Sequence, residues 1–120
     1  MSHEATARAY YRAIDDGDYG SLADLLSPEF VHERPDRTLS GRESFLEFMR
    51  EERPRTDTEH RVDAVYASVD VATDPAAPEV VVRGRLLNDD GGTLFDFVDV
   101  FEFASTDPDA TAAHLTTYTD

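Results

Sequence analysis

Apolar residues recur at helical spacing near the start of the chain. The repeating positions are Ala7, Tyr10, Tyr11 and Ile14. This i, i+3, i+4, i+7 pattern predicts a helix over residues 4–16 with one buried stripe. Gly17 follows where a helix C-cap is expected. Ser21 and Asp24 form a capping-box pattern that predicts a short second helix over residues 22–26.

The next segment changes from helix to strand and back. Residues 29–34 alternate, which predicts a strand with Phe30, His32 and Arg34 on one face. Residues 35–39 are expected to form a loop. Ser40 and Glu43 then form a second capping-box pattern, which predicts a third helix that runs to about residue 52.

From about residue 58 the hydrophobic period becomes two. The alternation predicts strands over residues 58–71, 79–87, 93–103 and 112–118, and the sequence NDDGG at 88–92 predicts a tight hairpin. Helices followed by an antiparallel meander indicate an α+β fold. We expect a strongly bent antiparallel sheet with three N-terminal helices, in one domain over residues 1–120, and a pocket where the helices leave the concave face open.

The charge balance is unusually acidic. The chain has 26 acidic and 11 basic residues, all of them arginine, for a formal net charge of −15. Halophilic proteins use high net charge to stay soluble, and concentrated salt screens the resulting self-repulsion. The composition therefore favours a salt-adapted protein, with an acidic protein from an arginine-biased genome as the alternative. No basic stripe is present for a phosphate backbone, so we expect no nucleic-acid partner.

Composition also narrows the compartment and the chemistry. The chain has no cysteine, which excludes disulfides and thiolate metal sites. No apolar run is long enough for a membrane span, and no secretory signal pattern opens the chain, so we expect a cytoplasmic protein without a membrane partner. The four histidines lack metal-ligand spacing, and no glycine-rich phosphate loop is present. We therefore expect no metal and no cofactor.

Several short motifs, in this order, resemble one known family. They are YYRAIDDGD at 10–18, LLSPEFV at 25–31, SGRE at 40–43 leading to Phe48, VDVFEF at 98–103 and HLTTYTD at 114–120. Together they resemble the SnoaL-like and ketosteroid-isomerase-like branch of the nuclear transport factor 2-like superfamily. The resemblance implies a cone with one deep pocket and a homodimer formed through the outer sheet face. It also implies a small, largely apolar ligand, bound either for cofactor-independent acid–base chemistry or without turnover.

Asp99 is the first candidate for chemistry. The strand pattern places it on one face with Phe97, Phe101 and Phe103, where a carboxylate must be solvated, paired or protonated. A neutral carboxylic acid can donate to an oxyanion, and ketosteroid isomerase is the known example of that arrangement. By resemblance, Tyr10 is expected to complete an oxyanion hole with Asp99. The alternatives are an ion pair with an arginine across the sheet, or a plain polar lining.

The proton-accepting residue departs from the family pattern. Arg34 stands where ketosteroid isomerases carry an aspartate base, and an arginine stays protonated. His32, on the same face, is the alternative base, because histidine titrates near neutral pH. Arg34 and His60 are expected to bind ligand, and Phe97, Phe101 and Phe48 to line the pocket. The histidines are equally compatible with a polar core role.

Overall fold

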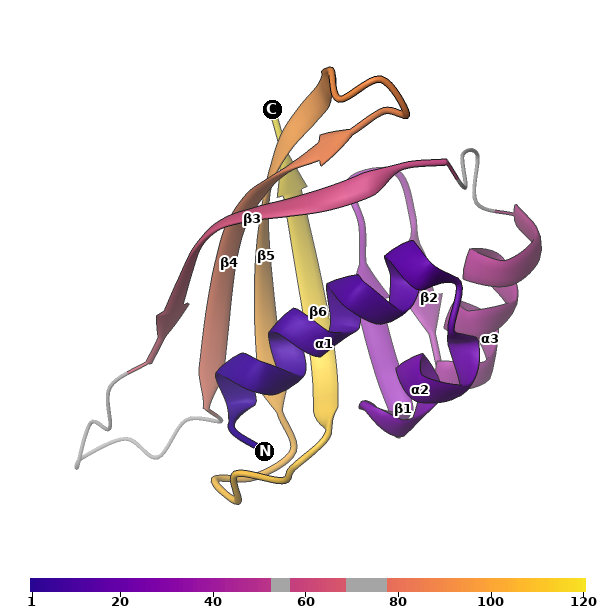
Figure 1. Ribbon diagram of the computed structural model, residues 1–120. Coiled ribbons are helices and arrows are strands. Elements are labelled where there is room, and N and C mark those ends of the chain that lie inside the picture. Colours follow the sequence, from indigo (N-terminus) through magenta and orange to yellow (C-terminus); the bar gives the residue numbers. More distant parts are fainter. Residues whose placement is uncertain (53–56, 69–77) are drawn as a thin grey trace.

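The computed structural model describes residues 1–52, 57–68 and 78–120 (Figure 1). Its helices are α1 (His3–Asp16), α2 (Tyr19–Asp24), α3 (Arg42–Glu47) and the single π-helical turn η1 (Phe48–Glu52). Its strands are β1 (Leu26–Glu33), β2 (Thr38–Ser40), β3 (Glu59–Ala67), β4 (Glu79–Leu87), β5 (Thr93–Phe103) and β6 (Ala112–Thr119).

The strands of the described residues form one curled, unclosed sheet. Its order is β2-β1-β6-β5-β4-β3, so β3 to β6 form a consecutive antiparallel meander and β1 pairs in parallel with β6. Helix α1 lies across the inner face of the sheet, and α2 and α3 lie beside β1 (Figure 1). The predicted α+β fold is therefore confirmed.

Helix α1 begins and ends where its sequence indicates. The Ser2 hydroxyl accepts from the backbone N–H of Ala5 at 3.0 Å, which satisfies one of the open donors of the first turn. Gly17 ends the helix in the left-handed conformation with φ of 68°. The stripe that contains Tyr10, Tyr11 and Ile14 is buried against the sheet.

Several predicted boundaries were wrong: α2 ends at Asp24 and β1 already begins at Leu26, where the sequence pattern predicts the end of the second helix. Helix α2 begins at Tyr19, because Asp18 is its cap and accepts from the N–H of Ser21 at 3.1 Å. Ser40 does not cap the third helix, because it belongs to β2 and pairs with Val31 of β1. Helix α3 instead follows Gly41, which has no side chain to act as a cap. The predicted loop over residues 35–39 thus contains the start of a short strand. The end expected for the third helix at Pro54 and the strand residues 69–71 lie outside the described residues.

Strand β5 carries the alternation that the sequence predicts. Phe97, Asp99, Phe101 and Phe103 are buried, whereas the residues between them are partly exposed. Opposite Phe97, the chain needs a glycine. A β-carbon at position 84 would lie 2.4 Å from the carbonyl oxygen of Arg61 and 2.8 Å from the ring of Phe97. Gly84 therefore lets β3, β4 and the Phe97 side chain approach one another closely.

Candidate functional site

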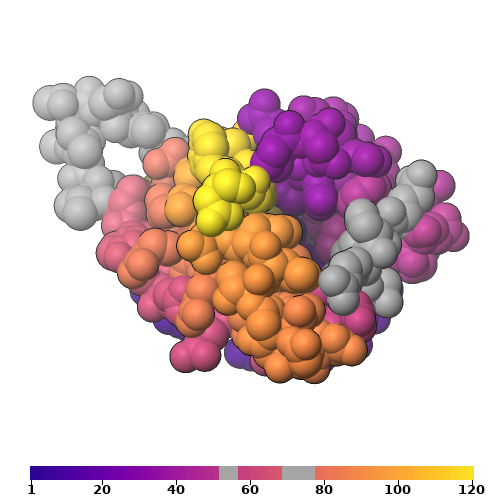
Figure 2. All heavy atoms as spheres, turned by 90° about the horizontal axis from the view of Figure 1, so that it is seen from above, coloured from indigo at the N-terminus to yellow at the C-terminus, as the bar shows by residue number. Residues whose placement is uncertain are grey.

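A pocket of about 250 Å³ lies between the helices and the inner face of the sheet. It is lined by Tyr10, Ile14, His32, Arg34, Pro35, Met49, Thr58, His60, Leu86, Leu94, Phe95, Phe97, Asp99, Thr117 and Thr119. The hairpin between β4 and β5, the end of β6 and the β1–β2 segment surround one end of the molecule (Figure 2). Each of these three segments contributes lining residues, so the pocket is built from parts of the chain that are far apart in sequence.

Two residues expected to line this pocket do not. Phe101 is 1% exposed and packs in the core, with its ring centroid 5.2 Å from that of Tyr10. Phe48 is buried beneath two guanidinium groups, those of Arg34 and Arg37, which lie 4.9 and 4.8 Å from its ring centroid. These rings support the walls, since the residues they pack against, Tyr10 and Arg34, do line the pocket.

Asp99 is the buried acid of the pocket, and it is 5% exposed. Its Oδ2 accepts from the hydroxyl of Tyr11 at 2.6 Å, and its Oδ1 accepts from the hydroxyl of Thr117 at 2.5 Å. The tyrosine that pairs with Asp99 is therefore Tyr11, whereas the resemblance had suggested Tyr10. Tyr10 lines the pocket beside it, and the two rings are perpendicular with centroids 5.1 Å apart.

Burial controls the electrostatics of this pair. Desolvation raises the pKa of Asp99, and this effect outweighs the hydrogen bonds from Thr117 and Tyr11 and the nearby charges of His60 and Arg34, which lower it. Burial, followed by the charge of Asp99, raises the pKa of Tyr11 well above its ordinary value. Tyr11 therefore acts as a hydrogen-bond donor, and Asp99 holds a proton more readily than an exposed aspartate.

His32 continues the same network. Its Nε2 lies 2.8 Å from the hydroxyl oxygen of Thr117. Burial, then the charge of Arg34, lowers the pKa of His32 from 6.5 to about 3. The imidazole is therefore neutral near neutral pH and is a weak proton acceptor, which makes it less suited to the base role that the sequence suggested.

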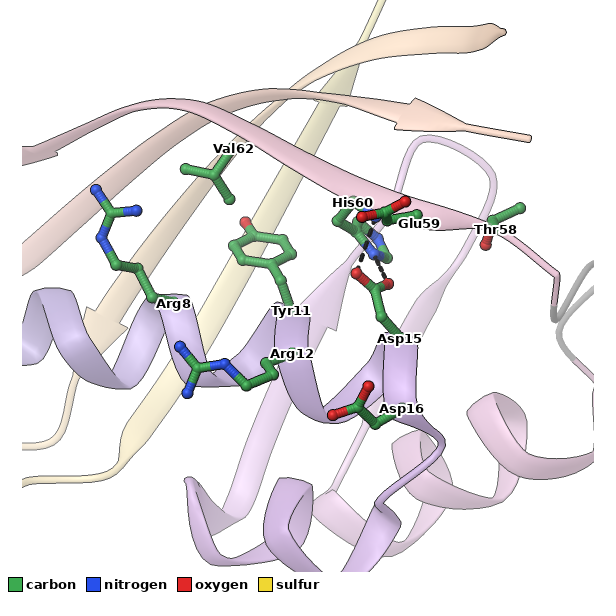
Figure 3. Close-up of a pocket in the computed structure, with 9 residues that line it drawn as sticks. All are labelled: Arg8, Tyr11, Arg12, Asp15, Asp16, Thr58, Glu59, His60 and Val62. Carbon is green, nitrogen blue, oxygen red and sulfur yellow. Dashed lines mark hydrogen bonds and ion pairs between the residues drawn. The ribbon is translucent and has the colours of Figure 1, made fainter. Parts of the chain in front are cut away.

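His60 is held differently, by an aspartate on α1. Its Nδ1 lies 2.6 Å from Oδ1 of Asp15, and its backbone N–H donates to Oδ2 of the same carboxylate at 3.0 Å (Figure 3). The two side chains are 17% and 19% exposed. A carboxylate on Nδ1 fixes the ring orientation and leaves Nε2 as the proton-accepting nitrogen.

His60 also stands at the border of a second space. An open groove of about 560 Å³ lies between α1 and β3, and Figure 3 shows its lining residues. This groove and the inner pocket share Thr58 and His60. The Asp15–His60 pair therefore lies where the pocket wall meets solvent, a position from which protons can exchange with water.

Arg34 is held at the pocket rim. Its Nε lies 3.3 Å from Oδ1 of Asp36, and its guanidinium stacks on Phe48. Both contacts limit its rotation, so its charge stays near the mouth. Within residues 1–52, 57–68 and 78–120, no group of three potential metal-binding side chains is gathered. No helix in that part of the chain is long and apolar enough to cross a membrane.

Three residues of this site were missed in the sequence. Tyr11 and Asp15 are one helical turn apart on α1. Tyr11 binds Asp99 of β5 and Asp15 binds His60 of β3, and these pairings depend on the direction in which α1 crosses the sheet. Thr117 stands directly opposite Asp99 in the β5–β6 register. The alternation in HLTTYTD carries a signal for Thr117, because it places this residue on the same face as the buried Leu115.

Comparison with known proteins identifies the fold and the family. The structure of a nuclear transport factor 2-like protein from Novosphingobium aromaticivorans is similar with a TM-score of 0.79 at 13% identity, covering 95% of this chain and 77% of that one. A proposed ketosteroid isomerase from Kribbella flavida gives 0.69 at 21% identity, with 98% and 76% covered. A proposed polyketide cyclase from Sinorhizobium meliloti gives 0.70 at 15% identity, with 95% and 94% covered.

These identities are low and show the fold alone. No curated protein matches the sequence. The family model of the SnoaL-like domain, however, matches residues 7–114, which includes every residue of the two polar pairs, Asp15 with His60 and Asp99 with Tyr11. The chain therefore belongs to the SnoaL-like domain family, with the nuclear transport factor 2-like fold.

Proposed function

We propose that this protein binds a small, largely apolar organic molecule in the inner pocket and performs cofactor-independent acid–base chemistry on it. The observation that carries the proposal is that two different polar pairs border one apolar pocket. His60, held by Asp15, and Asp99, held by Tyr11, are both lining residues. Pairs of titratable groups in contrasting environments are typical of an acid and a base that act on one substrate.

Pocket size and lining define the ligand class. Pockets for drug-sized ligands have volumes of about 300–1,000 Å³, so a pocket of about 250 Å³ suits a smaller molecule of one or two rings. Its apolar walls are Ile14, Met49, Leu86, Leu94, Phe95 and Phe97. Asp99 and the rim charge of Arg34 favour a ligand that carries a carbonyl or hydroxyl oxygen, and an isomerase, dehydratase or hydrolase type of reaction.

Each polar group has a distinct proposed role. His60 accepts a proton from the ligand, and the Asp15 carboxylate stabilises the imidazolium that forms. Asp99, with its raised pKa, supplies a proton or hydrogen bond to the ligand oxygen. Tyr10 forms part of the wall around that oxygen, and His32 acts through Thr117 to position Asp99.

A ligand titration followed by NMR tests the binding proposal. Adding one- and two-ring ketones is expected to shift the methyl signals of Ile14 and Met49, which line the pocket. The methyl signals of Val100 are the matched control, because Val100 points from β5 to the opposite face of the sheet from Asp99. Shifts confined to Val100, or no shift at any concentration, would contradict binding inside the pocket.

A second candidate function is ligand binding without turnover. The observation that favours it is that both carboxylate oxygens of Asp99 already accept hydrogen bonds from the protein, from Tyr11 and from Thr117. An acid so fully bonded recognises a ligand oxygen only after one of these bonds opens. Pocket binding of ketones with no proton exchange at any carbon would favour this candidate over the enzyme.

We also propose that two copies associate through the outer face of the sheet. No described helix covers this face, and it exposes Tyr66 and Tyr118, which are 55% and 59% exposed. The register places Tyr66 opposite Val81 and Tyr118 opposite Val98, which joins the exposed rings to an apolar patch. Sedimentation velocity is expected to give a dimer that Tyr118→Asp weakens, and a monomer at high concentration would rule out this association.

The net charge of −15 supports a further proposal, that the protein works in a salt-rich cytosol. Salt at about 1 M shortens the Debye length to about 3 Å and therefore removes most repulsion between exposed carboxylates. The melting temperature is expected to rise between dilute buffer and molar KCl. An equal rise in molar sucrose would instead point to a general effect of excluded solutes.

A further inference from the structure

Four side chains from four elements are joined in one hydrogen-bonded chain. Tyr11 of α1 donates to Asp99 of β5 at 2.6 Å, and Thr117 of β6 donates to the other oxygen of Asp99 at 2.5 Å. His32 of β1 reaches Thr117 with its Nε2 at 2.8 Å. Because Thr117 has a single hydroxyl hydrogen, the direction of its two bonds depends on where the protons of its neighbours are.

When Asp99 is ionised, the number of available hydrogens determines which atom donates in each of the two hydrogen bonds of Thr117. The Thr117 hydrogen then points to Oδ1 of Asp99, so Thr117 has only lone pairs to offer His32. His32 must therefore carry its proton on Nε2 and donate it to Thr117. Its Nδ1 is left without a hydrogen, and this atom is buried with no hydrogen-bond partner.

The opposite arrangement follows when Asp99 holds a proton on Oδ1. That proton donates to the Thr117 oxygen, and the Thr117 hydrogen turns toward Nε2 of His32. Nε2 must then accept, so the imidazole carries its proton on Nδ1. The two arrangements use the same pairs of heavy atoms, and each hydrogen bond only reverses its direction.

We propose that Thr117 is a proton relay that couples the protonation of Asp99 to the tautomer of His32. A proton from solvent that reaches Nδ1 of His32 through the inner pocket, which this residue lines, is matched by transfer of the Nε2 proton to the Thr117 oxygen and of the Thr117 hydroxyl proton to Oδ1 of Asp99. The net change is one proton gained by Asp99, with His32 neutral before and after. Its use in resupplying the acid rests on the proposed function, but the coupling itself does not.

The charged groups around the network fit a relay through a neutral imidazole. Asp99 faces His60 of β3 and Arg34, which directly follows β1. The charge of Arg34, and that of His60 when its imidazole is protonated, favour the ionised form of Asp99. His32 faces Arg34 and His114, which disfavour an imidazolium, and Asp36, which favours it less strongly than Arg34 opposes it. With the imidazolium disfavoured, His32 responds to Asp99 by changing its tautomer and not its charge.

Nitrogen-15 NMR of the His32 ring tests the relay without a ligand. In the wild type at a pH above the pKa of Asp99, where this carboxyl is ionised, Nε2 is expected to carry the proton. Asp99→Asn imitates the protonated acid, because Tyr11 donates to the remaining carbonyl oxygen and the amide NH2 faces Thr117. In this variant the two ring nitrogens are expected to exchange their chemical shifts, so that Nδ1 carries the proton.

Matched variants separate the relay from a general disturbance. Thr117→Ser keeps the hydroxyl. In this variant, adding Asp99→Asn is still expected to exchange the chemical shifts of the two His32 ring nitrogens. Thr117→Val removes the hydroxyl, and the tautomer of His32 is then expected to be the same with aspartate or asparagine at position 99. An unchanged tautomer in Asp99→Asn with Thr117 intact, or an exchange that survives Thr117→Val, would overturn the proposal.

Discussion

The wild type is expected to lose stability as the pH falls from about 6.5 to about 3, and replacing His32 with Gln is expected to remove most of that loss. Burial and the charge of Arg34 lower the pKa of His32 in the folded protein, whereas an unfolded chain takes up the proton near 6.5. Acid therefore favours the unfolded state. A shift of this size corresponds to roughly 4–5 kcal/mol, since each pKa unit is about 1.4 kcal/mol.

The sign of this effect distinguishes His32 from Asp99. The His32 contribution is complete above pH 6.5 and falls away as the pH approaches about 3. Asp99 has a raised pKa, so its contribution runs the other way, and the folded state gains relative stability as acid protonates it. Urea unfolding at a series of pH values therefore measures the difference between two opposing contributions, and the comparison of wild type with His32→Gln isolates the one from His32.

Glutamine suits this test because its side-chain amide can donate to Thr117 as Nε2 of His32 does. His3→Gln is the matched control, since His3 lies at the edge of the fold with its Nε2 2.7 Å from the carbonyl oxygen of Asp107. The control is expected to keep the acid-dependent loss. If His32→Gln loses as much stability in acid as the wild type, His32 is not the buried neutral group described above.

Replacing His60 with Ala is expected to slow proton exchange on a bound ketone by the factor that general base catalysis contributes. If His60 is the base, wild-type protein in D2O speeds the replacement of hydrogen by deuterium at the carbon beside the carbonyl. The proton leaves carbon for Nε2, and a deuteron from solvent returns by the same route. General acid–base catalysis contributes about 10²–10⁴-fold, so a loss in that range is expected.

Two further variants locate the effect in the Asp15–His60 pair. Asp15→Asn keeps the histidine but removes the charge that stabilises the imidazolium, and an intermediate loss is expected. His114→Ala removes a histidine that contacts Glu33 and Glu102 away from the inner pocket, and exchange is expected to be unchanged. Exchange that survives His60→Ala at the wild-type rate would assign the base to another residue.

Much of the fold is readable in the sequence because it rests on local periodicity. The α1 stripe, the Gly17 cap and the inward face of β5 are all properties of consecutive residues. The short strand β2 was not predicted, because its three residues become a strand only by pairing with β1. The cap of α2 at Asp18 was missed since Asp18 and Ser21 both suit an N-cap.

The sequence predicts the residues that line the pocket better than it predicts the hydrogen bonds between them. Six of the eight predicted residues line the pocket, which are Asp99, Tyr10, His32, Arg34, His60 and Phe97. Which tyrosine reaches Asp99 depends on the rotation of α1 over the sheet, and periodicity does not separate Tyr10 from Tyr11, because both are buried. The partners Asp15 and Thr117 depend on packing between elements distant in sequence.

A crystal structure with a small cyclic ketone bound shows directly whether one ligand lies between the two polar pairs, Asp15 with His60 and Tyr11 with Asp99. We expect the ketone inside the inner pocket, with its oxygen within hydrogen-bond reach of Asp99 and a neighbouring carbon facing Nε2 of His60. A ketone bound only in the outer groove, or one whose oxygen points away from Asp99 toward solvent, would contradict this expectation.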